Sequence, residues 1–341
     1  MSWGLALAER GLLPDPLVRA GIRNLLRDRL AAERAGRDRR RPALLRAMRE
    51  GPVAAVPDRA NAQHYEVPAR FFEMILGPRL KYSCALWNDP GADLARAEEA
   101  MLRLTAERAG IEDGMEVLEL GCGWGSLCLW LAETRPACRI TAVTNSAAQK
   151  AFIDGRARER GLSSRLQVIR ADMNGFAAPG RYDRVVSVEM FEHMRNYEEL
   201  LARVAGWLRP GGALFLHVFA HRELAYPFET GERGDWMARH FFSGGLMPSE
   251  DLFDAFDRDL RVTERWAVSG QHYARTLRAW LGRLDARRPE VDALFRRVYG
   301  PGEARRRAER WRIFLMACEE LFAWRGGEEW RVAHFLLEPV G

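Results

Sequence analysis

Two carboxylates and an imidazole fall within five residues of this chain, at Glu189, Glu192 and His193. Ionisable groups lose hydration when a fold buries them, so such a cluster is costly unless it serves a purpose. The structural alternative is a helix N-terminus whose acids offset the helix dipole, but Glu198 and Glu199 already serve the following helix. The cluster therefore indicates general-base and charge-stabilising work beside a substrate.

A glycine-rich loop follows the first apolar strand of the central region, which ends in Glu119 and Leu120. The loop contains Gly121, Gly123 and Gly125, so the pattern is E-x-G-x-G-x-G and not the dinucleotide fingerprint G-x-G-x-x-G. A carboxylate before the turn would repel a pyrophosphate, whereas it can neutralise the sulfonium and ammonium charges of S-adenosylmethionine. A purely structural strand-to-helix turn is the alternative. The loop favours S-adenosylmethionine as co-substrate.

Further apolar segments at 139–143, 166–169, 184–188 and 214–218 are typical of strands that alternate with helices. Their spacing predicts an α/β fold with a doubly wound, parallel, Rossmann-like sheet, in which the carboxyl ends of the strands form the ligand crevice. Polar or adenine-compatible side chains stand at two of these ends. The expected contacts to the ribose, the amino-acid tail or the adenine are Thr144, Asn145, Gln149, Asp172 and Met173.

With 341 residues the chain exceeds one typical core, which indicates a sheet domain plus additional segments. We expect a helical N-terminal extension, a helical segment that covers the cofactor, the cofactor-binding core, and a helical cap that forms the substrate region and ends in an antiparallel edge strand, Trp330 to Leu337. The expected boundaries are 1–60, 61–112, 113–220 and 221–341.

Composition narrows the functional classes. The sequence has no long uncharged apolar run, its first residues are too charged for a secretory signal, and its five cysteines form neither a metal-ligand spacing nor a disulfide framework. We therefore expect a cytoplasmic protein without a metal ion. The net charge is +5 and all but two of the basic residues are arginine, without the aromatic interleaving of a nucleic-acid surface. An amphipathic helix after Pro16 either packs on the body or touches anionic lipid through its arginines.

Several motifs together resemble the cyclopropane-fatty-acid synthase family of S-adenosylmethionine-dependent methyltransferases. These motifs are Tyr82–Trp87, Leu118–Gly125, Glu189–His193, Pro210–Gly212 and His272–Trp280. Other segments are similar to the coclaurine N-methyltransferase branch of that family, which methylates ring amines: Thr141–Ser146, Phe191–Tyr197, Phe241–Ser249 and Gly327–Phe335. The resemblance covers nearly the whole chain and implies a class I methyltransferase fold.

The resemblance also implies roles for individual residues. Tyr82, Ser83, Gly121 and Gly123 would line the cofactor site, together with Thr144, Gln149, Asp172 and Met173. Glu189, Glu192 and His193 match the residues that position and deprotonate the amine in the N-methyltransferase branch. The synthase branch holds a bicarbonate base instead, and its ligands map to Cys84, Glu192, His217 and Tyr273, all of which have the required residue types.

The preferred interpretation is methyl transfer from S-adenosylmethionine to the nitrogen of a small hydrophobic amine, such as an isoquinoline-like ring. Glu192 with His193 is then the expected general base, and Glu189 holds the substrate cation. The rival is transfer of a methylene or methyl group to an unsaturated acyl chain of a lipid, with bound bicarbonate as base. A cofactor-binding module without catalysis is a third, weaker alternative, because the acid and histidine cluster would then have no purpose.

Overall fold

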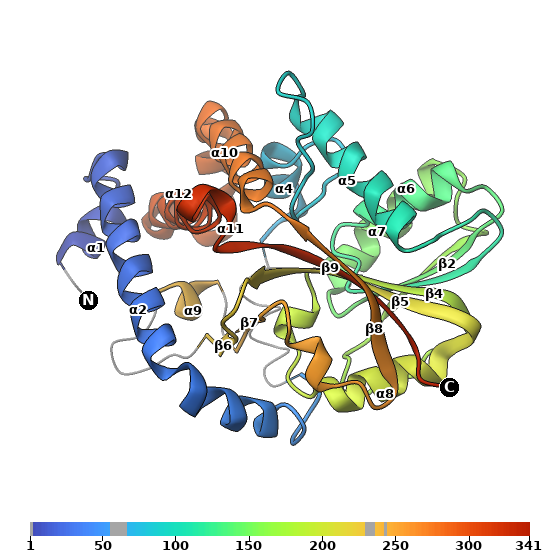
Figure 1. Ribbon diagram of the computed structural model, residues 1–341. Helices are drawn as coiled ribbons and strands as arrows, with labels where there is room; N and C mark the ends of the chain where they lie inside the picture. Colours follow the sequence, from blue (N-terminus) through green and yellow to red (C-terminus); the bar gives the residue numbers. More distant parts are fainter. Residues whose placement is uncertain (1–2, 55–66, 229–235, 242–243) are drawn as a thin grey trace.

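The computed structural model describes residues 3–54, 67–228, 236–241 and 244–341. Within this part of the chain, one mixed sheet has seven strands in the order β3-β2-β1-β4-β5-β9-β8 (Figure 1). The pairs from β3 to β5 are parallel, and β9 is antiparallel to both of its neighbours. The strands are β1 (Glu116–Leu120), β2 (Arg139–Thr144), β3 (Leu166–Arg170), β4 (Tyr182–Val188), β5 (Leu208–His221), β8 (Leu260–Val268) and β9 (Trp330–Pro339). A small second sheet pairs β6 (Tyr226–Pro227) with β7 (Leu246–Met247).

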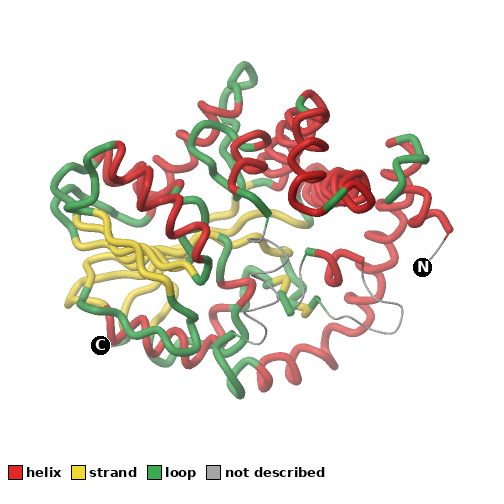
Figure 2. The backbone as a smooth tube through the Cα atoms, turned by 180° about the vertical axis from the view of Figure 1, so that it is seen from behind, coloured by secondary structure: helices red, strands yellow, loops and turns green. Residues whose placement is uncertain are grey.

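Helices cover both faces of the seven-stranded sheet (Figures 1 and 2). One face packs against α5 (Leu94–Arg108), α6 (Ser126–Thr134) and α7 (Ala147–Glu159), and the other against α8 (Tyr197–Trp207). Side chains alternate along the strands, so Val117 joins the first layer while Leu118 and Leu120 join the second. The parallel sheet and its helices confirm the expected fold class.

The cap consists of three helices inserted between the last two strands of the sheet in chain order. After β8 the chain forms α10 (Gly270–Ala286), α11 (Arg288–Tyr299) and α12 (Pro301–Ala323), and it then returns through the 3-10 helix η3 (Trp324–Gly327) to β9. The shorter helices are α1 (Trp3–Ala8), α4 (Ala69–Ile75), α9 (Trp236–His240) and the 3-10 helices η1 (Phe191–His193) and η2 (Phe253–Ala255). Because β8 and β9 flank the cap in the sequence, the region 221–341 contributes both to the sheet and to the cap.

The long helix α2 (Asp15–Ala47) runs along the outside of α12 and continues toward α8 (Figure 1). Pro16 lies in its first turn, where the missing N–H has no cost. Two of the arginines expected on its polar face, Arg19 and Arg23, form ion pairs with acids of α12. The helix therefore packs on the body, as one of the two interpretations of its sequence required.

The final strand differs from its predicted position. Residues 330–337 were expected at the edge of the sheet, but β9 lies inside it, between β5 and β8, and β8 forms the edge. Most side chains of β8 are exposed or half-exposed, which hides the strand in a search for apolar segments. Of the segments that carry the resemblance, residues 242 and 243 lie outside the described residues.

None of the helices in the described part of the chain is long and apolar enough to cross a membrane.

Candidate functional site: a cavity between sheet and cap

The loop after β1 has a backbone conformation that calls for glycine at three positions. Gly121, Gly123 and Gly125 all have positive φ angles, of 80°, 53° and 82°, which favour glycine. A Cβ atom on Gly121 would lie 2.6 Å from Cγ of Met190, so this position also has no room for a side chain. The three glycines thus follow from backbone conformation and, at Gly121, from packing against the segment after β4.

Glu119 is a buried carboxylate beside this loop. Burial raises its pKa to about 7, and its Oε2 atom has no hydrogen-bond partner. A buried oxygen without a partner is unfavourable unless a ligand supplies one. The sulfonium and ammonium groups of S-adenosylmethionine would supply compensating charge, so the residue fits the co-substrate that its sequence context predicts.

A cavity lies between the loop, the ends of the central strands and the cap. Five residues expected at the cofactor line it: Tyr82, Ser83, Glu119, Gly121 and Gly123. The cap and the segment before it contribute an apolar wall, formed by Phe228, Met237, Met247, Leu277, Trp280, Phe314, Cys318, Leu321 and Phe322. One continuous space therefore has a polar end at the glycine loop and an apolar end at the cap.

The other expected cofactor residues stand at the carboxyl ends of β2 and β3 and, for Gln149, in the first turn of α7, outside the lining of this cavity. Thr144 Oγ1 lies 2.6 Å from Gln149 Oε1, and Gln149 Nε2 is buried without a partner. The strand ends place Asn145, Asp172 and Met173 beside them along the same edge of the sheet. Their contact with the co-substrate remains a prediction.

Three donors surround the carboxylate of Glu189. Its Oε1 accepts a hydrogen bond from the Cys84 backbone N–H at 3.0 Å and lies 3.2 Å from Nε2 of His217, while Tyr273 donates its hydroxyl to Oε2 at 2.5 Å. Glu189 lines the cavity and directly follows β4, with a φ angle of 49° that is rare for a residue with a side chain. These contacts hold one carboxylate at the centre of the site.

The same three residues were expected, with Glu192, to hold bicarbonate in the synthase branch. In this structure their donors bind Glu189, and the Cys84 thiol donates to the Ala85 carbonyl at 3.3 Å. Three of the four expected ligands therefore meet, but they meet around a side chain of the protein, and Glu192 is not among them.

The expected base residues Glu192 and His193 lie on the 3-10 helix η1 and point to different places. His193 lines the cavity, and burial lowers its pKa to about 4. Glu192 does not line the cavity; it is fully buried and its Oε1 accepts the Phe219 backbone N–H at 2.8 Å. Burial, followed by the nearby charge of Glu189, raises the pKa of Glu192 well above its ordinary value, and its Oε2 atom is buried without a hydrogen-bond partner.

The residues that sequence reasoning missed are Lys81, Arg108 and His334. Lys81 lines the cavity, is buried, and donates from Nζ to Ser83 Oγ at 2.5 Å. It is one of only two lysines in an arginine-rich chain, and this rarity could have marked it as a candidate site residue. His334 lies far from His217 in the sequence, and only strand register places the two side by side. The described residues hold no group of three or more His, Cys, Asp or Glu that could bind a metal ion.

Comparison with known proteins identifies the family of this chain. A family model described as mycolic acid cyclopropane synthetase matches residues 55–330. The (S)-coclaurine N-methyltransferase of Thalictrum flavum subsp. glaucum is 38% identical over 338 residues, which cover 97% of this chain and 93% of the relative. The cyclopropane-fatty-acyl-phospholipid synthase of Escherichia coli (strain K12) is 30% identical over 276 residues, covering 79% of this chain and 66% of that protein.

Solved structures agree with the sequence comparisons. A coclaurine N-methyltransferase bound to N-methylheliamine and SAH superposes with a TM-score of 0.93 at 36% identity and covers 98% of both chains. The cyclopropane synthase MmaA2 from Mycobacterium tuberculosis superposes with a TM-score of 0.68 at 25% identity, over 82% of this chain and 97% of its own. The chain therefore belongs to the mycolic acid cyclopropane synthetase family, and it is an S-adenosylmethionine-dependent methyltransferase.

Proposed function

We propose that the protein transfers the methyl group of S-adenosylmethionine to the nitrogen of a small hydrophobic amine, such as a cyclic, isoquinoline-like amine. The observation that carries this proposal is the carboxylate of Glu189, held by Cys84, His217 and Tyr273 where the synthase branch is expected to hold bicarbonate. Burial raises the pKa of Glu189, and the nearby cation Lys81 acts against this rise. A substrate that is itself a hydrophobic cation would favour the ionised carboxylate in the same way. The names of the relatives, which are N-methyltransferases, support the same chemistry.

The apolar wall of the cavity supports the substrate class. The wall includes the aromatic side chains of Phe228, Phe314 and Phe322 and the adaptable apolar side chains of Met237 and Met247, and such residues suit a flat hydrophobic substrate. An ammonium group near such rings also gains cation–π attraction. The cavity thus offers apolar contacts for the ring system and one carboxylate for the nitrogen.

The proposed chemistry is a direct displacement. S-adenosylmethionine supplies an electrophilic methyl group on a positively charged sulfur. The lone pair of the amine forms the new N–C bond, the C–S bond breaks with its electrons going to sulfur, and the amine proton must pass to a base. Glu189 orients the nitrogen, and Glu189 with the neutral imidazole of His193 accepts the proton at the cavity wall.

This assignment moves the base from Glu192 to the residues that line the cavity. Because Glu192 does not line the cavity and accepts the Phe219 backbone N–H, we propose that it supports the η1 turn. Its raised pKa favours the neutral form, which a glutamine resembles, so we expect Glu192→Gln to retain kcat within about tenfold. Glu189→Gln and His193→Ala should each lower kcat by on the order of 10²-fold. A larger loss for Glu192→Gln than for Glu189→Gln would return the base to Glu192.

The test of the function uses labelled S-adenosylmethionine with two classes of acceptor. One arm is a panel of cyclic secondary and tertiary amines, and the other is vesicles of unsaturated phospholipid, each measured with and without bicarbonate. We expect label in the amines and no effect of bicarbonate depletion. Label in the acyl chains, lost on depletion and restored by added bicarbonate, would contradict the proposal and support the lipid chemistry.

A further inference from the structure

A row of polar side chains crosses the sheet behind Glu189. His217 on β5 and His334 on β9 are direct neighbours in the antiparallel register, and both are fully buried. His334 Nε2 lies 2.9 Å from His217 Nδ1, and His217 Nε2 lies 3.2 Å from Glu189 Oε1. At the other end Arg108, from the last turn of α5, lies 2.8 Å from His334 Nδ1. Three hydrogen bonds therefore connect Arg108 to the carboxylate in the cavity.

The direction of this chain follows from the chemistry of its first member. A guanidinium group has only N–H donors and no acceptor. His334 Nδ1 must therefore accept from Arg108, which puts the proton of its neutral ring on Nε2. His334 then donates to His217 Nδ1, so the proton of His217 also sits on Nε2 and points at Glu189. One permanent donor thus sets the tautomer of two imidazoles in sequence.

Both rings are neutral, as this argument requires. Burial is the largest cause that lowers the pKa of His217 and of His334 well below the ordinary value, and the nearby cations Lys81 and Arg108 act in the same direction. Phe215 packs edge-on against His334. A neutral imidazole with one N–H can serve as donor at one nitrogen only, so its orientation matters.

Arg108 is itself held in place. Its guanidinium lies 5.0 Å from the ring centre of Trp266 on β8, and Trp266 is the register partner of His334. The row therefore extends from the edge strand β8 through β9 and β5 to the end of β4. Side chains that face each other in register share a face of the sheet, here the face that packs against α5.

We propose that Arg108 and His334 are positioning residues that act through His217 to keep a donor aimed at Glu189. The consequence is a carboxylate that receives the same set of donors in every molecule and stays an acceptor for the substrate nitrogen. This inference rests on the proposed role of Glu189, but the arrangement of protons that it requires exists without any substrate.

The test reads the tautomers directly by ¹⁵N NMR of histidine-labelled protein, in which protonated and unprotonated ring nitrogens resonate apart. The chain has seven histidines, so the signals of His217 and His334 are assigned by their loss in His217→Gln and His334→Gln. In the wild type we expect both rings to carry the proton on Nε2. Glu189→Met removes the acceptor end, and we expect both tautomers to persist because Arg108 still sets them.

The deciding variant is the double substitution Arg108→Met with Glu189→Met. It removes both ends of the chain, and we expect each of the two rings to show a mixture of tautomers. The matched control is Arg103→Met with Glu189→Met, which removes an exposed arginine from the same helix and should leave single tautomers. Mixed tautomers in Glu189→Met alone, or single tautomers in the Arg108 double variant, would overturn the proposal.

Kinetics provide the second readout once a methyl acceptor is in hand. Arg108→Met should lower kcat by about three- to tenfold with the KM for S-adenosylmethionine within twofold, and Arg103→Met should change neither. Glutamine can accept from Arg108 and donate to His217, so His334→Gln should retain more activity than His334→Leu. Equal kcat in all four variants would show that the chain does not position Glu189, even if the NMR result holds. Failure of every amine as acceptor would refute the proposed function while leaving the tautomer result valid.

Discussion

At the scale of single residues, the site depends on groups whose charge is set by burial. Glu119 is the simplest case, because its pKa of about 7 has burial as its main cause and one of its oxygens has no partner. Below about pH 7 the free protein holds this carboxyl protonated, and above it the group is ionised. A cationic ligand binds the ionised form better, so ligand affinity and ionisation are linked.

We therefore expect the affinity for S-adenosylmethionine to rise as the pH increases through about 7, with release of a proton on binding at lower pH. S-adenosylhomocysteine lacks the sulfonium charge and should show a smaller pH dependence. Calorimetric titration in buffers of different ionisation enthalpy measures both quantities. In Glu119→Gln the pH dependence should disappear; an unchanged profile in that variant would assign the linkage to another group.

The glycine loop gives a second prediction at this scale. Gly121→Ala introduces a Cβ atom 2.6 Å from Met190 at a φ angle of 80°, whereas Gly161→Ala meets no atom within 4 Å at a φ angle of 68°. The control therefore carries backbone strain alone, about 1 kcal/mol, and Gly121→Ala adds roughly 1–3 kcal/mol of overpacking. Urea denaturation should show the larger loss for Gly121→Ala. Equal losses would mean that the Met190 side chain moves aside without cost.

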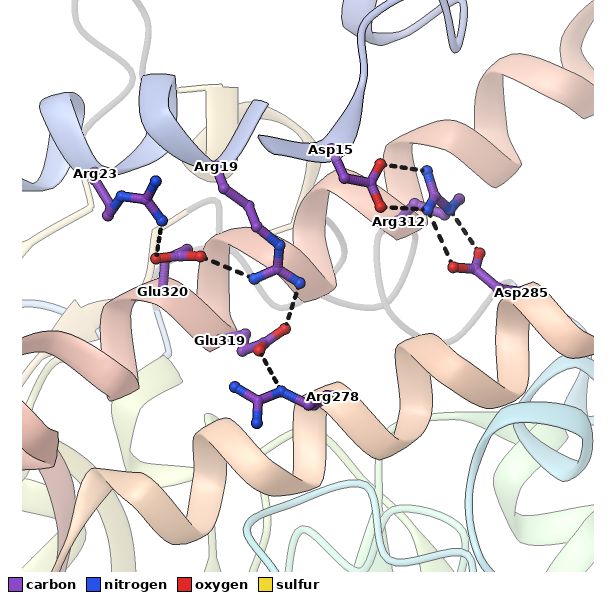
Figure 3. A network of polar contacts seen from close by, with 8 residues as sticks. All are labelled: Asp15, Arg19, Arg23, Arg278, Asp285, Arg312, Glu319 and Glu320. Atoms are coloured by element: carbon purple, nitrogen blue, oxygen red, sulfur yellow. Dashed lines mark hydrogen bonds and ion pairs between the residues drawn. The ribbon is translucent and has the colours of Figure 1, made fainter. Parts of the chain in front are cut away.

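At the scale of secondary-structure elements, α2 is fastened to the cap by two groups of ion pairs (Figure 3). Arg19 and Arg23 reach Glu319 and Glu320 on α12, and Arg278 on α10 shares Glu319. About two helical turns before Glu319 on α12, Arg312 lies between Asp15 at the start of α2 and Asp285 at the end of α10. These contacts join three helices from distant parts of the sequence.

The two groups should differ in strength because their burial differs. The Arg312 side chain is 17% exposed and forms ion pairs with three carboxylates, those of Asp15, Asp285 and Glu309. Its removal would leave Asp15 and Asp285 without the cation that they share. We expect Arg312→Leu to lower the free energy of unfolding by about 1–2 kcal/mol. Arg23 is 45% exposed with one partner, so Arg23→Leu should cost at most about 0.5 kcal/mol. Denaturant titration compares the two, and similar values would show that burial does not decide the strength of this clamp.

Individual elements also show which parts of the structure the sequence could predict. The five parallel strands and the helix after the glycine loop follow from short apolar segments and glycine spacing, because local conformation and burial dictate them. The position of β9 inside the sheet could not be predicted in this way, because an apolar strand has the same sequence pattern at the edge of a sheet and inside it. Its neighbour β8 has mostly exposed side chains and so gives no apolar pattern.

The site shows the same division between local and distant causes. Glu189 and His193 were predicted from their neighbours in the sequence, and both line the cavity. The preference for Glu192 over Glu189 as the base depended on the direction in which each side chain points, and a 3-10 turn decides that direction. His334 and Arg108 reach Glu189 only through strand register and helix packing, between residues up to 226 positions apart.

At the scale of the whole molecule, the cap and the sheet should unfold together. The cap helices are inserted between β8 and β9, and α2 contacts the cap at one end, while the residues after it reach the sheet layer. Arg49 pairs with Glu198 at the start of α8, and the Tyr197 backbone N–H donates to the Met48 carbonyl at 3.2 Å. A cap joined to the sheet by one connection could open alone. This cap is connected at three places, through β8, through β9 and through α2.

We therefore expect a single cooperative unfolding transition in which ligand binding protects both layers. A ligand at 100 times its Kd adds about 2.7 kcal/mol to the free energy of unfolding. Native-state hydrogen exchange with S-adenosylhomocysteine should therefore slow the most protected amides of β5 in the sheet and of α12 in the cap by the same factor, because both exchange through the same global opening. If α12 exchanged faster than β5 and gained less protection from the ligand, the cap would open by itself. The cavity would then have a gate formed by α10 to α12, and substrate entry would not require movement of the sheet.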